Sequence, residues 1–261
     1  MEYPYLPTRN GPFRYLSSLV FTNLCIDKSV SLLTQLAKIA LRLFRSDKGA
    51  FFNAVGRVAD TSMTHKYFEK LRKLWIRTTL SNVHRSGANY KLALAYLMKD
   101  PWNLGSSEEA LRFQKTNKIF EEVFGHVNTL LEIGCGEGLQ SAHLQKLCNE
   151  LTGIDVVPRA INRAILALPN AKFLVGDIGD VPWSQQLQNF DAVVAFEVLL
   201  YVKDVEQAIA RMNRLGRACM ISCYEQAVHH IEPALEKIPN VSRRVITAGD
   251  KRWVVAWWKS G

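Results

Sequence analysis

The sequence lacks several features that would assign it to a specialised class of protein. Its five cysteines are odd in number and form no CxxC pair, so it indicates neither a disulfide framework nor a zinc cage. No apolar run reaches the roughly 20 residues that a bilayer-spanning helix needs, and the first residues lack the pattern of a secretory signal. Hydrophobic residues make up 48% and charged residues 22%, as in globular proteins. We therefore expect a reduced, cytoplasmic setting.

Acidic residues are scarce in the first third of the chain. Residues 1–88 hold 14 of the 33 lysines and arginines but only 5 of the 24 aspartates and glutamates, whereas residues 89–261 hold 19 of each. This difference in charge predicts two regions with different roles. We expect a basic, helical N-terminal extension over 1–88 and a second domain over 89–261, made of a helical lead-in (89–125) and a core (126–261).

The segment from Lys28 to Arg45 contains no acidic residue and has helical periodicity. At about 100° per residue, its polar side chains fall on one arc and its apolar side chains fill the other. Such a helix can lie on an anionic membrane surface, which would make the protein peripheral there, or pack on its own domain; both interpretations stay open. A second basic helix is predicted over 64–77. A solvated face is favoured there over nucleic-acid binding, because no recognition motif accompanies it.

After about residue 126, short apolar runs alternate with helical stretches. The runs LLEI, LTGID, AKFLVGD, FDAVVAF and ACMISC predict five parallel strands joined by crossover helices. The last two runs, SRRVITAG and KRWVVAWWK, flank Gly249-Asp250 and predict a terminal antiparallel hairpin. The sequence thus predicts an α/β fold, with a doubly wound, seven-stranded mixed sheet.

The first predicted strand runs into a glycine turn, EIGCGEG, with glycines at Gly134, Gly136 and Gly138. A dinucleotide fingerprint requires GxGxxG, and the last position here is Leu139. A phosphate-binding loop requires Gly-Lys-Ser/Thr, which is absent. Glycine still allows positive φ and a close approach of the backbone to a ligand. The turn therefore favours a ligand without phosphates.

Acidic residues stand at the ends of three successive predicted strands. Glu132 precedes the turn and can order it around an ammonium group. Asp155 ends the second strand, where a carboxylate can accept both hydroxyls of a ribose. Asp177 follows the third strand, with Ile178 beside it, where an exocyclic adenine amine can donate. Together these residues predict a nucleoside site with an amino-acid end.

The segments EIGCGEG, GID, GDI and FDAVVAFEVLLYV resemble those of class I S-adenosylmethionine-dependent methyltransferases over about 126–261. The terminal hairpin is similar to the sixth and seventh strands of that family. The resemblance implies a Rossmann-like methyltransferase fold and S-adenosyl-L-methionine as cofactor, bound by the glycine turn and the strand-end acids. No metal site is expected.

A narrower resemblance lies upstream. Tyr96, Asp-Pro-Trp at 100–102 and SSEEALRF at 106–113 are similar to the segment before the core in the nodulation protein S family. Those enzymes N-methylate a glucosamine unit of a lipo-chitooligosaccharide. Glu108 stands where that family usually has tyrosine, so the substrate does not transfer with the motif.

Four further residues are candidates for the site. Glu197 ends the fourth predicted strand, where ligands bind in open α/β sheets, and is a candidate catalytic residue that orients the acceptor or takes its proton. Its alternative role is structural, with the side chain capping a helix. Tyr201 and Tyr96 are expected to contact the acceptor, and Trp102 to stack on adenine or sugar. The pair His229 and His230 is a weaker candidate base.

The leading hypothesis is a methyltransferase that acts on an amine or hydroxyl of a small molecule, glycan or glycolipid. A second gives the basic first third an RNA or protein substrate, but no Asn/Asp-Pro-Pro-Tyr/Phe/Trp motif follows the fourth strand. A third treats the chain as a non-catalytic module that binds the cofactor and a partner. An NAD-dependent dehydrogenase is the weakest alternative, because the third glycine of its fingerprint is missing.

Overall fold

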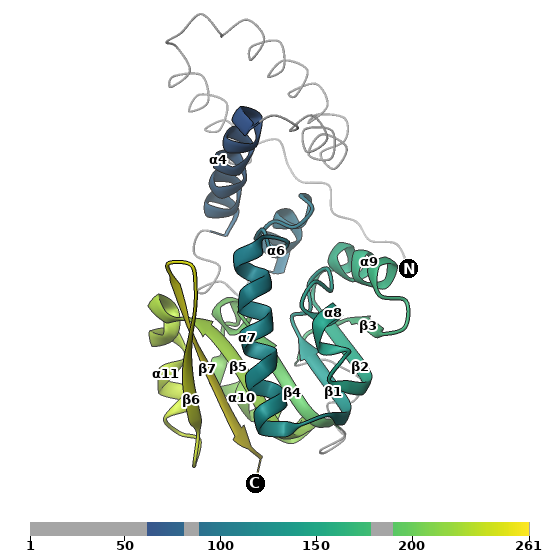
Figure 1. Cartoon of the computed structure of the whole chain (residues 1–261), viewed down its shortest axis with the longest axis vertical. Helices are drawn as coiled ribbons and strands as arrows, with labels where there is room; N and C mark the ends of the chain where they lie inside the picture. Colours follow the sequence, from purple (N-terminus) through teal and green to yellow (C-terminus); the bar gives the residue numbers. More distant parts are fainter. Residues whose placement is uncertain (1–61, 81–88, 179–189, 261) are drawn as a thin grey trace, which may run out of the picture. The chain divides into compact units, whose positions relative to one another are not determined.

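The structure is a computed structural model that describes residues 62–80, 89–178 and 190–260 (Figure 1). The chain forms two compact units, 1–54 and 55–261, and every described residue belongs to the second. The helix expected over 28–45 lies outside the described residues. The domain boundary at residue 88 stays a prediction.

Seven strands form one mixed sheet in the order β3-β2-β1-β4-β5-β7-β6. The first five strands are parallel, and β7 runs antiparallel between β5 and β6. The predicted fold class, with its terminal hairpin, is confirmed. The strands are β1 (Val127–Ile133), β2 (Cys148–Asp155), β3 (Lys172–Val175), β4 (Phe190–Phe196), β5 (Gly216–Tyr224), β6 (Ser242–Ala248) and β7 (Lys251–Lys259).

Helices join the parallel strands, as the sequence predicted. The helix that follows the glycine turn is short: α8 covers only Ser141–Leu144, because the glycine turn occupies the residues before it. The helices are α4 (Ser62–Thr79), α6 (Asn89–Ala95), α7 (Ser107–Phe124), α8, α9 (Pro158–Ala167), α10 (Val205–Leu215) and α11 (Glu232–Leu235), with 3-10 helices η1 (Leu199–Tyr201) and η2 (Glu225–His230).

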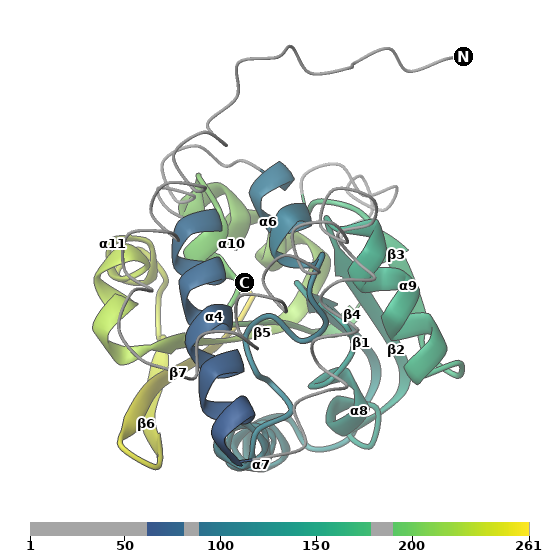
Figure 2. The ribbon, with the colours of Figure 1, turned by 90° about the horizontal axis from the view of Figure 1, so that it is seen from above.

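Each face of the sheet carries its own hydrophobic cluster. Leu131 and Ile133 of β1 pack in one cluster with Met212 of α10, whereas Leu130 packs in the other with Phe120 of α7. Figure 2 shows α10 and α11 on one side of the sheet and α7 and α8 on the other. Because helices cover both faces, the central strands are nearly continuous apolar runs. This sandwich places the carboxyl ends of the parallel strands at one common edge.

The basic helix predicted over 64–77 is confirmed as α4. Lys70, Lys73 and Arg77 are exposed, whereas Arg72 is 7% exposed and donates to the Pro101 carbonyl at 3.3 Å. Arg72 thereby ties α4 to the lead-in. No helix in the described ranges is both long enough and apolar enough to cross a membrane.

Candidate cofactor and acceptor site

A cavity of about 690 Å³ opens at the carboxyl ends of the parallel strands. This volume is in the usual range for small-molecule sites. Eight residues between Asn89 and Phe113 line it, so the lead-in forms part of the wall. Ten of the predicted site residues line it: Tyr96, Trp102, Glu132, Gly134, Gly136, Asp155, Asp177, Ile178, Glu197 and Tyr201.

The glycine turn needs glycine for two reasons, backbone conformation and space. Gly134, Gly136 and Gly138 have φ of 69°, 56° and 82°. Residues other than glycine rarely adopt this backbone conformation. A Cβ on Gly134 would lie 2.2 Å from Val198 Cγ2, and one on Gly136 would lie 2.6 Å from Tyr96 Oη. Gly138 does not line the cavity; its lack of a side chain lets α9 pack closely behind the turn, since a Cβ there would lie 3.3 Å from Ala164 Cβ.

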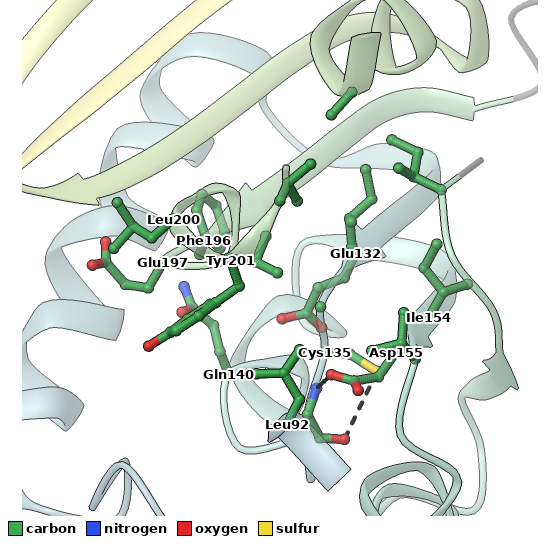
Figure 3. Close-up of a pocket in the computed structure, with 18 of the residues that line it drawn as sticks. Leu92, Glu132, Cys135, Gln140, Ile154, Asp155, Phe196, Glu197, Leu200 and Tyr201 are labelled. Carbon is green, nitrogen blue, oxygen red and sulfur yellow. Dashed lines mark hydrogen bonds between the residues drawn. The ribbon is translucent and has the colours of Figure 1, made fainter. Parts of the chain in front are cut away.

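Asp155 holds the glycine turn and the start of α9 together. Its Oδ2 accepts the N–H of Gly136 at 3.0 Å (Figure 3). Its Oδ1 accepts the N–H of Val157 at 2.9 Å. Burial raises the pKa of this carboxyl to about 6, although the two backbone hydrogen bonds oppose the shift. Asp155 is therefore fixed in orientation, and an ionised carboxylate retains further lone pairs for a ligand hydroxyl. Asp177 is exposed at the end of β3, and Ile178 beside it is buried.

Glu132 is a buried carboxyl group beneath the turn, 3% exposed. It accepts a hydrogen bond from Ser141 Oγ at the start of α8. Burial raises the pKa of Glu132 to about 7, and the charge of Asp155 adds to this shift. A cation placed in the cavity would favour the ionised form. The site therefore suits a ligand that brings an ammonium group to Glu132.

The structure also brings to the cavity three residues for which the sequence indicated no ligand role: Arg112, Glu109 and Gln140. Arg112 is 2% exposed; its Nε donates to Glu109 Oε2 at 2.6 Å and its Nη1 to Gln140 Oε1 at 3.2 Å. This contact fixes the Gln140 amide and leaves its buried Nε2 with no hydrogen-bond partner among the described residues. A buried donor without a partner costs free energy, so a ligand oxygen would stabilise it. The signal in the sequence is an arginine on the apolar face of a predicted helix.

Glu197 lies at the end of β4 with a positive φ of 59°. Its carboxylate accepts Ser222 Oγ at 2.7 Å and the N–H of Tyr224 at 3.0 Å. Burial raises the pKa of Glu197, whereas the charge of Arg112 and the two hydrogen bonds lower it. The side chain therefore bonds to β5 and does not cap a helix, and it lines the cavity in a fixed orientation.

An aromatic wall covers part of the cavity. Trp102 Nε1 donates to Tyr201 Oη at 2.8 Å, and the Tyr96 and Trp102 ring centroids are 5.0 Å apart. Burial raises the pKa of Tyr201 to about 12, so its phenol is protonated at neutral pH. The three rings offer flat apolar surface to adenine or to a sugar.

The weaker candidates lie elsewhere. His229 and His230 are exposed on η2, with rings 4.0 Å apart, and neither lines the cavity. Cys219 and Cys223 are buried in the core. Over 62–80, 89–178 and 190–260, no group of three or more histidine, cysteine, aspartate or glutamate residues could hold a metal ion.

The strand order, the glycine turn and the cavity define a class I methyltransferase fold, as predicted. Residues 131–218, about a third of the chain, match the family model described as a methyltransferase domain.

The resemblance to nodulation protein S is also confirmed. The chain is 34% identical to that protein from Sinorhizobium fredii over 109 residues, 41% of this chain and 50% of the relative. It is 32% identical to that from Bradyrhizobium diazoefficiens over 117 residues, 44% of this chain and 56% of the relative. The chain thus spans about half the length of the curated relatives it matches.

A solved structure agrees with the fold. The crystal structure of the N-methyltransferase NodS from Bradyrhizobium japonicum in complex with S-adenosyl-L-homocysteine superposes with a TM-score of 0.54 at 24% identity. The superposition covers 66% of this chain and 97% of that chain. At this identity the likeness establishes the fold alone.

Proposed function

We propose that this protein is an S-adenosylmethionine-dependent methyltransferase, with the transferase domain over 89–261. One observation carries the proposal: a glycine turn of positive φ faces a cavity together with Asp155 and Glu132. The methyltransferase match over 131–218 supports the same conclusion.

Each part of the cofactor has a residue of suitable chemistry in the cavity. Asp155 accepts the ribose hydroxyls, and Asp177 accepts the adenine amine, with Ile178 against the ring. Glu132 receives the ammonium group. The Nε2 of Gln140 and the guanidinium of Arg112 donate to the carboxylate, which gives the buried amide the partner it lacks. The cofactor supplies a methyl group on a sulfonium; the chain supplies its orientation.

The acceptor is proposed to be an amine or hydroxyl of a small molecule, glycan or glycolipid. Its lone pair forms a bond to the methyl carbon while the carbon–sulfur bond breaks, and the electron pair stays on the sulfur of the thioether product. The acceptor must then lose a proton. Glu197 is placed to orient the acceptor and take this proton, because its carboxylate is held rigidly at the end of β4. Tyr201 and Tyr96 form the wall beside it.

The experiment measures S-adenosylhomocysteine binding by calorimetry and methyl transfer to a panel of amine and hydroxyl acceptors. Glu197→Gln should lower turnover by about 10²-fold or more and leave cofactor affinity within a few-fold. Ser222→Ala, which removes one bond to Glu197, serves as a control with a smaller loss. Preferential binding of NAD would contradict the cofactor assignment. Binding of S-adenosylhomocysteine without methyl transfer to any acceptor would favour the hypothesis of a non-catalytic, cofactor-binding module.

We also propose that residues 28–45 bring the protein to anionic membrane surfaces, where a lipid-linked acceptor would be found. The support is the sequence pattern alone, an apolar face beside four positive charges. Co-sedimentation with anionic vesicles at low and high salt tests it. A protein that stays in the supernatant at low salt would leave this segment a structural helix.

A further inference from the structure

One buried carboxylate beside the cavity has no part in the function proposed above. Glu137 follows Gly136 in the glycine turn, is 7% exposed, and is not among the described residues that line the cavity. Its Oε1 and Oε2 accept the backbone N–H of Asp100 at 3.1 and 3.2 Å. It also forms an ion pair with Arg163 of α9. Glu137 therefore bonds to the lead-in and not to a ligand.

The residues from Tyr96 to Gly105, here the cover segment, behave as one structural piece. Asp100 Oδ1 accepts the N–H of Leu104 at 2.6 Å, and Asp100 Oδ2 accepts that of Gly105 at 2.8 Å. Asp100 and Asn103 have positive φ values of 45° and 61°. These bonds tie Asp100 to Leu104 and Gly105, so a contact to Asp100 also constrains the end of the segment.

The cover segment extends across the cavity. At one end, Tyr96 Oη would lie only 2.6 Å from a Cβ on Gly136, which places the phenol directly on the glycine turn. Further along, the Trp102 indole donates to Tyr201, which follows β4. A ligand bound against the glycine turn and the end of β4 would therefore lie under this segment.

Besides Tyr201, three side chains from the rest of the protein bond to the backbone of the cover segment. Glu137 accepts from Asp100, Arg163 donates to the Met98 carbonyl at 3.0 Å, and Arg72 donates to the Pro101 carbonyl at 3.3 Å. Only the first two are linked to each other by an ion pair, with side-chain exposures of 6% and 23%. Because this pair is mostly desolvated, its loss leaves a charge poorly paired and weakens both contacts together.

We propose that Glu137, with Arg163, is a latch: a positioning residue that holds the cover segment closed and so sets the rate at which the cofactor and its product enter and leave. The inference rests on the proposed function, since the ligand is taken to be S-adenosylhomocysteine. A latch acts on the opening step, so its loss speeds both entry and exit. The ligand contacts remain, and affinity changes less than the rates do.

The test uses the full chain with Glu137→Gln and Arg163→Met, with Arg163→Lys as the conservative rescue. Glu206→Gln is the matched control, because Glu206 forms an exposed ion pair with Lys237, with 2.6 Å between Oε1 and Nζ, and neither residue lines the cavity. Hydrogen exchange of the cover segment is measured in the ligand-free protein. Stopped-flow displacement then gives the dissociation rate of S-adenosylhomocysteine, and calorimetry gives its affinity.

We expect faster exchange confined to the cover segment in both latch variants. We also expect dissociation about tenfold faster with affinity within about threefold, and partial recovery in Arg163→Lys. The control should match the wild type. Unchanged exchange and an unchanged dissociation rate in folded latch variants would overturn the latch, and so would a lower melting temperature without either effect.

A wild-type protein that binds no S-adenosylhomocysteine would contradict the proposed function and remove the ligand-exchange role. The exchange measurement would still report whether Glu137 holds the segment. The two failures are therefore distinguishable.

Discussion

The cavity has two walls that are built in different ways. The strand-end wall, formed by Glu132, the glycine turn, Asp155 and Asp177, comes from consecutive strand ends of one sheet. The lead-in wall, formed by Tyr96, Trp102, Glu109 and Arg112, precedes the sheet in sequence and is held by side-chain contacts to distant residues. Trp102 and its partner Tyr201 are 99 residues apart in the sequence, and Arg112 and its partner Gln140 are 28 apart.

The two walls are therefore stabilised by different interactions. The strand-end wall is held mainly by backbone hydrogen bonds of the sheet, and the Asp155 carboxylate fixes the glycine turn. A side-chain substitution elsewhere in this wall therefore leaves its backbone in place. The lead-in wall depends on a few buried polar contacts, and breaking one leaves a partner without a hydrogen bond. Substitutions in the lead-in wall should therefore affect folding, and those in the strand-end wall mainly ligand binding.

The largest effect is expected for Arg112→Met in the lead-in wall. It removes the partner of Glu109 and the contact to Gln140 from a site where Arg112 is 2% exposed. We expect the free energy of unfolding to fall by about 3–5 kcal/mol, measured by urea denaturation. Arg217→Met is the control, since that residue pairs with Asp191 in an exposed ion pair. A loss as small as that of the control would remove the distinction between the walls.

The next effect concerns Glu132 and pH. Burial raises its pKa from 4.5 to about 7, so the folded, ligand-free protein binds this proton more tightly than the unfolded chain. The contribution of Glu132 to the free energy of unfolding therefore falls as pH rises from about 4.5 to about 7.

In Glu132→Gln the side chain at this position does not titrate, so this contribution to the pH dependence is removed. The stability of this variant relative to the wild type should rise by roughly 2–3 kcal/mol between pH 5 and pH 8. Thermal unfolding of both proteins across this range measures it. A difference independent of pH would contradict the raised pKa.

A smaller effect is expected for Asp155→Ala in the strand-end wall. Loss of the ligand hydroxyl contact should weaken S-adenosylhomocysteine binding by about 1.5–3 kcal/mol in calorimetry. Asp191→Ala is the matched control, because Asp191 also accepts two backbone N–H groups, those of Asn128 and Thr129, but at the opposite end of the sheet. Equal loss of affinity in both variants would point to a general effect on the fold.

The smallest effect is expected for Tyr201→Phe. The Tyr201 side chain follows β4 and connects that end of the sheet to Trp102 of the lead-in wall. The substitution keeps the ring and removes the oxygen that accepts from Trp102 at 2.8 Å. We expect the free energy of unfolding to fall by about 1 kcal/mol and the acceptor KM to rise more than the cofactor KM. A larger rise in the cofactor KM would indicate that Tyr201 contacts the cofactor and not the acceptor.

The fold and the strand-end wall could be predicted from the sequence because their signals are local. Apolar runs of strand length separated by helical stretches define the sheet, and parallel strands bring their carboxyl ends to one edge. Glu132, Asp155 and Asp177 follow from that rule without any knowledge of contacts. The glycines at 134 and 136 follow from spacing alone, although the structure alone shows that Val198 and Tyr96 fill the space beside them.

The tertiary structure decided what the sequence left open in the site. Arg112 is an ordinary helical residue in sequence, and only folding shows that it is buried against Gln140, whose Nε2 has no hydrogen-bond partner among the described residues. Glu137 looks like part of the glycine motif, yet it turns to Asp100 and Arg163 and away from the ligand. The physical reason is range. Hydrophobic periodicity and turn chemistry act between neighbours in the chain, whereas a buried polar contact depends on which distant groups the folded chain brings within hydrogen-bonding distance.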